Sequence, residues 1–183
     1  MKFLRALFAG LLTTASTLAA ETAPTSTPIK SPTEMMREMR AAWLTRVPEK
    51  GSYTRSDEVV AVLMDWPLGE QTVTVLSSSG GDASLYTTST FGVIGGVGHE
   101  RVRKVAVEFV ASAQSFMDIT TPTTTFPYPD SHTLHFYMVT PSGVRRVSFP
   151  LSDIDRPDSP ARALYGSGQR VVTELRLITP NSK

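Results

Sequence analysis

The chain has 183 residues, no cysteine, and 18 Lys and Arg residues against 17 Asp and Glu residues. The lack of cysteine excludes disulfides and thiolate sites, and the near-neutral charge argues against nucleic acid or an anionic membrane surface as the partner. This length is enough for one hydrophobic core of ordinary size, so we expect a single domain.

Residues 1–20 have the layout of a secretory signal peptide. Two basic residues come first, an apolar run over residues 6–12 follows, and small residues lead to a cleavage position near Ala19 or Ala20. The alternative is an uncleaved N-terminal anchor, but the run is short for a helix that spans a bilayer. Cleavage would remove two of the 18 basic residues and none of the 17 acidic ones, leaving 16 against 17. We therefore expect an exported, soluble protein of the bacterial type, periplasmic or secreted, with no membrane span.

A linker and a first helix are predicted after the signal peptide. Residues 21–31 are rich in Thr, Pro and Ser, which is typical of a flexible linker. Ser31 and Glu34 match an S-x-x-E capping box, and Pro32 suits the first helical position. Apolar side chains then recur at helical spacing, which predicts an amphipathic helix whose apolar face packs in the core rather than on a partner. These side chains are Met35, Met36, Met39, Ala42 and Trp43.

Three strands in an antiparallel meander are expected next. Residues 59–64 form a continuous apolar run, typical of a strand covered on both faces. The sequence WPLG places Pro67 second and Gly69 fourth in a predicted type I turn. Alternating residues in QTVTVLS and from Ala83 to Thr87, joined by the turn SSGGDAS, predict the other two strands.

The clearest helix pattern follows a glycine-rich stretch. Apolar residues between positions 102 and 117 keep the i, i+3, i+4 spacing of one helix face, with charged residues on the other. The loop over residues 118–131 is then stiffened by three prolines.

Two strands and a last helix complete the predicted order. The sequence TPSG, again with Pro second and Gly fourth, predicts the turn of a second hairpin. Ser159 and Pro160 match a helix N-cap and first position. Gly166 and Gly168 each cost about 1 kcal/mol in a helix interior, so residues 169–178 could instead form a strand.

The predicted class is α+β. We expect a single two-layer domain over residues 32–179, with a five-stranded, mainly antiparallel sheet packed by two or three helices, and a short tail at 180–183. This order of elements resembles the α-β(3)-α-β(2)-α topology of the secretion-chaperone-like fold and, more loosely, the profilin-like or roadblock-like sandwiches. The resemblance implies a protein-binding role and a possible homodimer.

The glycine-rich stretch has two interpretations. Its spacing matches neither the G-x-G-x-x-G fingerprint nor the G-x-x-x-x-G-K-[ST] of a P-loop. The favoured interpretation is a tight turn in which Val93, Ile94 and Val97 face the core and the glycines avoid side-chain clashes. The alternative is a small-ligand or anion site at residues 92–103 that uses free N–H groups at the helix N-terminus. Its residues would be Gly96, Gly98, His99, Arg101 and Arg103.

No metal site or cofactor is predicted. The sequence HERVR resembles H-E-x-x-H, but Arg103 stands where the second histidine belongs, and a cation there repels a metal ion. His132 and His135 lie three apart on a predicted strand and so point to opposite faces. A site combining His99, His135 and Asp65 has no support from ligand spacing.

Catalytic residues are not assigned. The serine in YGSGQ lacks the G-x-S-x-G frame and the preceding strand of a nucleophile elbow. Asp65 ends an apolar strand, where it is expected to cap the turn through Pro67. The alternative for Asp65 is a buried carboxyl with a raised pKa that could act as an acid or base.

A binding role is the favoured function. The sequence TTTFPYPD is stiff and carries Phe126 and Tyr128, which predicts a partner surface. The leading hypothesis is an exported, non-enzymatic binding or interaction module with an unknown protein or cell-envelope partner. A small-ligand or anion-binding protein using residues 92–103 is the alternative, and a hydrolase is a distant third.

Overall fold

The computed structural model describes residues 30–51, 53–89 and 92–179. The predicted signal peptide, most of the predicted linker and the tail at 180–183 lie outside these residues. No helix of the described segments is long and apolar enough to cross a membrane.

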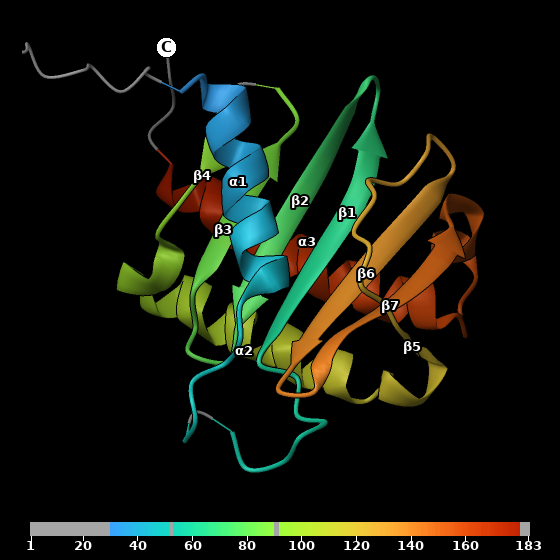
Figure 1. The fold of residues 1–183 in the computed structure, drawn as a ribbon. Coiled ribbons are helices and arrows are strands. Elements are labelled where there is room, and N and C mark those ends of the chain that lie inside the picture. Colours follow the sequence, from blue (N-terminus) through green and yellow to red (C-terminus); the bar gives the residue numbers. More distant parts are fainter. Residues whose placement is uncertain (1–29, 52, 90–91, 180–183) are drawn as a thin grey trace, which may run out of the picture.

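The described part of the chain contains three α-helices and one antiparallel sheet (Figure 1), which confirms the predicted α+β class. The helices are α1 (Pro32–Thr45), α2 (Glu100–Gln114) and α3 (Pro160–Ile178). The long strands are β1 (Ala61–Leu68), β2 (Gln71–Ser78), β3 (Ala83–Thr87), β6 (Thr133–Thr140) and β7 (Gly143–Pro150). Three short 3-10 segments are η1 (Gly96–Gly98), η2 (Met117–Ile119) and η3 (Leu151–Asp155).

Within the described ranges the sheet has seven strands, not the five expected, in the order β4-β3-β2-β1-β6-β7-β5. The five long strands are the predicted ones. The other two, β4 (Gly92–Val93) and β5 (Thr121–Pro122), are two residues long and extend the two edges of the sheet. Two residues cannot display an alternating pattern, so the sequence gives no sign of them.

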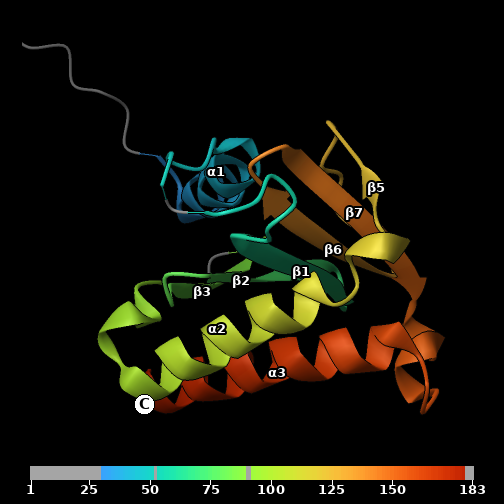
Figure 2. The ribbon, with the colours of Figure 1, turned by 90° about the horizontal axis from the view of Figure 1, so that it is seen from below.

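Helices cover both faces of the sheet, so the expectation of two layers is wrong. Figure 2 shows α1 on one side of the strands and α2 with α3 on the other. Along β1, Val62 and Met64 pack with α2 and α3, whereas Ala61 and Leu63 pack with α1. All four side chains are fully buried, and this confirms that the apolar run is a strand covered on both faces.

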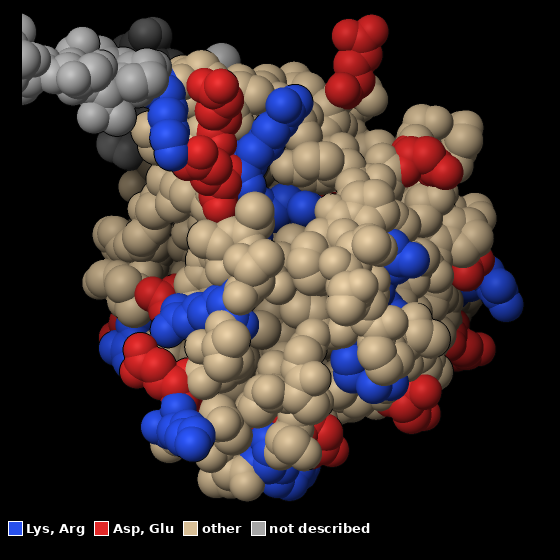
Figure 3. Space-filling model, in the orientation of Figure 1, with Lys and Arg blue, Asp and Glu red and all other residues tan. Residues whose placement is uncertain are grey.

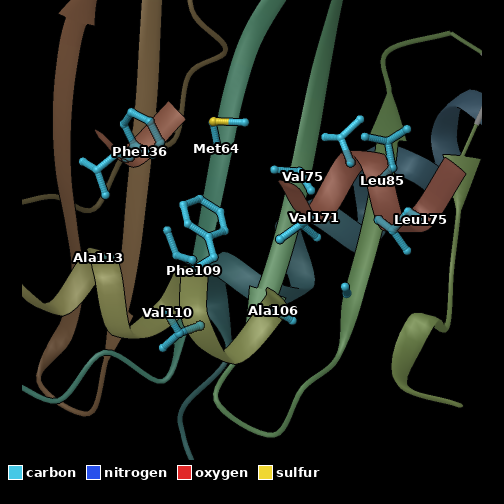
Figure 4. Close-up of a cluster of buried hydrophobic side chains, with 14 of the residues drawn as sticks. Met64, Val75, Leu85, Ala106, Phe109, Val110, Ala113, Phe136, Val171 and Leu175 are labelled. Carbon is cyan, nitrogen blue, oxygen red and sulfur yellow. The ribbon is translucent and has the colours of Figure 1, made fainter. Parts of the chain in front are cut away.

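The core beneath α2 and α3 follows the predicted helix periodicity. Phe109 and Ala106 of α2 lie next to Val171 and Leu175 of α3 and face the strands (Figure 4). The aromatic rings of Phe109 and Phe136 meet edge to face, with centroids 6.5 Å apart.

Helix α3 runs without a break through both of its glycines, so the alternative strand over 169–178 is wrong. A Cβ on Gly168 would lie 2.5 Å from Cε of Met64 and 3.3 Å from Cζ of Phe109. Glycine therefore lets α3 approach β1 closely, and the close packing offsets the cost of a helical glycine. Gly166 faces open space.

Helix α1 begins with the predicted capping box, but its buried face differs from the predicted one. Met36, Arg40 and Leu44 are buried at i, i+4 and i+8. Met35 is 45% exposed, and Ala42 is exposed. The predicted Met36, Met39 and Trp43 do pack in the core. Hydropathy assigns arginine to the solvent side, so the buried Arg40 was not expected.

The first predicted turn is displaced and the second is confirmed. Strand β1 continues through Pro67 to Leu68, and the chain turns at Gly69, whose φ is +62°. Proline is tolerated at this position because β6 pairs with β1 only as far as Asp65, which leaves one side of the strand without a partner strand. The hairpin at TPSG forms as predicted, with Thr140 opposite Gly143.

Candidate functional site

The glycine-rich stretch forms a turn whose central glycine faces the core. A Cβ on Gly96 would lie 2.6 Å from Cγ1 of Val102 and 2.9 Å from Cδ2 of Leu175. Val93 packs against the core as expected. Ile94 and Val97 are 51% and 41% exposed, so the expectation that they face the core is wrong. The tight approach of backbone to core is made by glycine because no side chain fits there.

The polar residues of this stretch point to different neighbours. Arg101 is exposed and forms an ion pair with Glu174 of α3 at 3.1 Å. Arg103 lies against Gly81 in the turn between β2 and β3. His99 is the N-cap residue of α2 and makes no side-chain capping hydrogen bond. The structure thus does not gather the two guanidinium groups around the loop N–H groups.

A buried ion pair lies on the α1 face of the sheet. Asp65 is fully buried and Arg40 is 5% exposed. Arg40 donates from Nε and Nη2 to Asp65 Oδ2, at 3.1 and 2.5 Å, and the Thr74 hydroxyl donates to Asp65 Oδ1. Burial raises the pKa of the Asp65 carboxyl, while Arg40 and Thr74 oppose the increase. Asp65 therefore does not cap the turn through Pro67, and the favoured interpretation of this residue was wrong.

The same arginine holds the loop that carries the predicted partner surface. Arg40 donates from Nη1 to the carbonyl of Phe126 at 3.0 Å, and the Tyr137 hydroxyl donates to the carbonyl of Pro127 at 2.6 Å. The Phe126 ring packs edge to face on Tyr137, and Arg40 Cζ lies 4.3 Å from the centroid of the Tyr128 ring. Both predicted surface aromatics are half-buried against the sheet.

His135 lies opposite Asp65 where β6 pairs with β1. Its Nδ1 is buried and has no hydrogen-bond partner among the described residues. Burial and Arg146 lower the pKa of His135, and the Asp65 carboxylate opposes this shift. Among the described residues, no three His, Asp or Glu side chains are grouped so that they could hold a metal ion.

A cavity of about 360 Å³ lies at the C-terminal end of α1. Its lining comes from α1 and the segment after it, from β1 and β6, and from the turn between β2 and β3. Val60, Ala61 and Val139 give it an apolar lining. Trp43, Arg46, Pro48 and Glu49 line it from the α1 side, and Ser78, Ser79, Gly80 and Asp82 line it from the turn. This volume and mixed lining fit a site for a small molecule.

The polar groups of the cavity are positioned by local hydrogen bonds. The Ser78 hydroxyl donates to Asp82 Oδ2 at 2.9 Å and accepts from the Asp82 N–H at 3.1 Å. The Ser79 N–H donates to the Val60 carbonyl at 2.9 Å, which ties the turn to the start of β1. On the α1 side, Arg46 Cζ lies 5.1 Å from the centroid of the Trp43 ring.

The sequence did not predict this cavity, because its lining residues come from segments that are distant in the chain.

A second cavity, of about 470 Å³, lies beside α3 and has no aromatic residue in its lining. Its two arginines are already engaged, Arg162 with the Asp155 carbonyl and Arg170 with Glu108. The cavity at the end of α1 is therefore the better candidate for a ligand site.

No protein-family model, curated protein or solved structure matches the chain. The resemblance in element order to the secretion-chaperone-like, profilin-like or roadblock-like folds stays a prediction.

Proposed function

We propose that the protein is an exported, non-enzymatic binding protein that holds a small ligand in the cavity at the C-terminal end of α1. The observation that carries the proposal is the cavity itself, in which an indole, a guanidinium group, two carboxylates and serine hydroxyls surround an apolar lining. Small-molecule sites combine an apolar wall with a few placed polar groups in this way. Export rests on the layout of residues 1–20.

Two other sites receive less support from the geometry. An anion site at residues 92–103 would need Arg101 and Arg103 beside the loop, but Arg101 forms an ion pair with Glu174 of α3. A partner surface at Phe126 and Tyr128 would use rings that already pack on Tyr137 and Arg40. On the face of the molecule that carries α1, basic and acidic side chains are interspersed, with no large patch of one sign (Figure 3).

A thermal-shift panel on the purified protein tests the proposal. Its probes are choline, glucose, phosphate and a nucleotide. A ligand present at about 100 times its Kd adds roughly 2.7 kcal/mol of stability, which raises Tm by several degrees in a protein of this size. Ser79→Phe should abolish the shift, since Ser79 is an exposed residue of the lining and a phenyl ring there competes with the ligand for the space.

Two controls separate the candidate sites. Ser115→Phe changes an exposed serine at the end of α2 and should keep the shift. Arg101→Ala, which changes an exposed arginine of the glycine-rich stretch, should also keep it. A shift that survives Ser79→Phe and disappears in Arg101→Ala would reject the cavity in favour of the glycine-rich stretch.

A further inference from the structure

We propose that the ligand of this cavity is an organic ammonium ion, held between the indole of Trp43 and the carboxylates of Asp82 and Glu49. The inference rests on the proposed function, because it concerns the same cavity, and it names the chemical class of the ligand.

The position of the cavity favours a cation. Helix α1 ends at Thr45, next to the lining residues Trp43 and Arg46, and its last turn contains no basic residue. The last carbonyl groups of a helix have no intrahelical partner and carry the negative end of the helix dipole. A positive group in the cavity is stabilised by these carbonyls, and a phosphate or carboxylate ligand is repelled.

The Trp43 ring already contacts a cation of the protein itself, the Arg46 guanidinium group. The guanidinium carbon of Arg46 lies 5.1 Å from the centroid of the Trp43 ring, within the range of a cation–π interaction. Arg46 follows the last residue of α1 and is exposed. It therefore occupies the place of a ligand cation without being fixed there, and a ligand of like charge competes with it for the indole.

The lining of the cavity contains two acidic residues and one basic residue, so its net charge is negative. Glu49 and Asp82 carry the acidic charges and Arg46 the basic one. Ser78 fixes Asp82 through a hydrogen bond to Oδ2, while Oδ1 accepts no hydrogen bond from the described residues. A carboxylate oxygen of this kind can pair with a positive ligand.

The apolar part of the lining selects an organic cation over a hydrated metal ion. Glu49 and Asp82 are the acidic residues of the lining. Val60, Ala61 and Val139 offer no oxygen ligands from their side chains, and Mg²⁺ and Ca²⁺ require several oxygen ligands. Among the described residues, no three His, Asp or Glu side chains are grouped to hold a metal ion. Methyl or methylene groups around an ammonium nitrogen can contact these side chains and the indole together.

Calorimetric titration with choline tests the inference, with 3,3-dimethyl-1-butanol as the control ligand. This alcohol has the shape of choline but carries carbon in place of the charged nitrogen. Choline should bind at least about tenfold more tightly, given the strength of cation–π and ionic contacts. Equal binding of the two ligands would overturn the inference.

Protein variants sharpen the test. Arg46→Gln removes the competing cation and should tighten choline binding about threefold or more. Asp82→Asn should weaken it by a similar factor, and Trp43→Leu should weaken it at least about tenfold. Lys104→Gln removes an exposed cation on α2, away from the cavity, and should leave the affinity unchanged. Because Arg46 is exposed, its variant tests the inference even if Trp43→Leu fails to fold.

The failure of the inference is distinguishable from that of the proposed function. Weaker choline binding by Arg46→Gln would reject the ammonium ligand. Binding of glucose or phosphate that Ser79→Phe abolishes, without binding of choline, would reject the inference and leave the proposed function standing. If none of these probes binds, both are rejected.

Discussion

Arg40 in α1 and Asp65 in β1 form an ion pair in which both charged groups are removed from water, with side chains 6% and 0% exposed. They lie 25 residues apart in the chain. Arg40 also bonds the carbonyl of Phe126, so one guanidinium group joins the first helix, the sheet and the loop between β5 and β6.

Replacing Arg40 should destabilise the protein strongly. Arg40→Met leaves the Asp65 carboxylate buried without its cation, and removing one partner of a buried pair costs about 3–5 kcal/mol. Arg37→Met, an exposed arginine on the same helix, should change stability by less than about 0.5 kcal/mol. Urea denaturation of the two variants measures the difference. Equal stability would show that the pair contributes nothing to the fold.

The two glycines of η1 should respond differently to alanine. Gly96→Ala places a methyl group 2.6 Å from Cγ1 of Val102 and 3.2 Å from the Ala83 carbonyl, and neither atom can move freely. We expect a loss of about 1–3 kcal/mol, typical of overpacking. Gly98 faces open space, so Gly98→Ala should be close to neutral. Thermal unfolding of both variants tests the close approach of this turn to the core, and a larger loss for Gly98→Ala would contradict it.

Helix α3 offers a second matched pair of glycines. Gly166→Ala should stabilise the protein by up to about 1 kcal/mol, because alanine is the better helix former and its Cβ meets nothing. Gly168→Ala should not, since the fully buried Met64 would have to move within a filled core. Guanidinium denaturation of the two variants gives the comparison. A similar gain from both would mean that α3 does not approach β1 as closely as described.

His135 should make stability depend on pH in mildly acidic solution. Its pKa is lowered in the folded state, so above pH of about 6.5 the histidine is neutral in both states and contributes no dependence. As the pH falls through about 6.5, the unfolded chain binds a proton first. The free energy of unfolding then decreases by up to about 1.4 kcal/mol per pH unit until the folded pKa is reached.

The measurement is urea denaturation between pH 7 and pH 5 for the wild type, His135→Gln and His132→Gln. His135→Gln should flatten the pH dependence in this window. His132 precedes β6, at an exposed position, and its replacement should leave the profile unchanged. A profile that His135→Gln does not alter would contradict a histidine that resists protonation in the folded state.

Local signals in the sequence predicted most of the long elements. The capping box of Ser31 and Glu34, the turn between Thr140 and Gly143 and the periodicity of α2 each depend on residues close together in the chain. The burial of Arg40 in α1 was not predicted, because it depends on Asp65 in another element. No hydropathy pattern contains that information.

The candidate site was beyond sequence reasoning for the same reason. Trp43 and Arg46 share a helical spacing of three, but Asp82 and Val139 reach the cavity only through the pairing of strands and the docking of α1. The glycine-rich stretch was considered as an anion site because several glycines precede a helix. The burial of Gly96 indicates that this composition serves packing.

Ligand binding in the cavity at the end of α1 can be mapped residue by residue. The most direct measurement is a titration of ¹⁵N-labelled protein with choline, followed by amide and indole chemical shifts. We expect the largest changes at the Trp43 indole and at the amides of Ser79, Gly80 and Asp82. Changes centred instead on residues 96–103 or 126–128 would contradict binding in this cavity, and no saturable change would reject choline as the ligand.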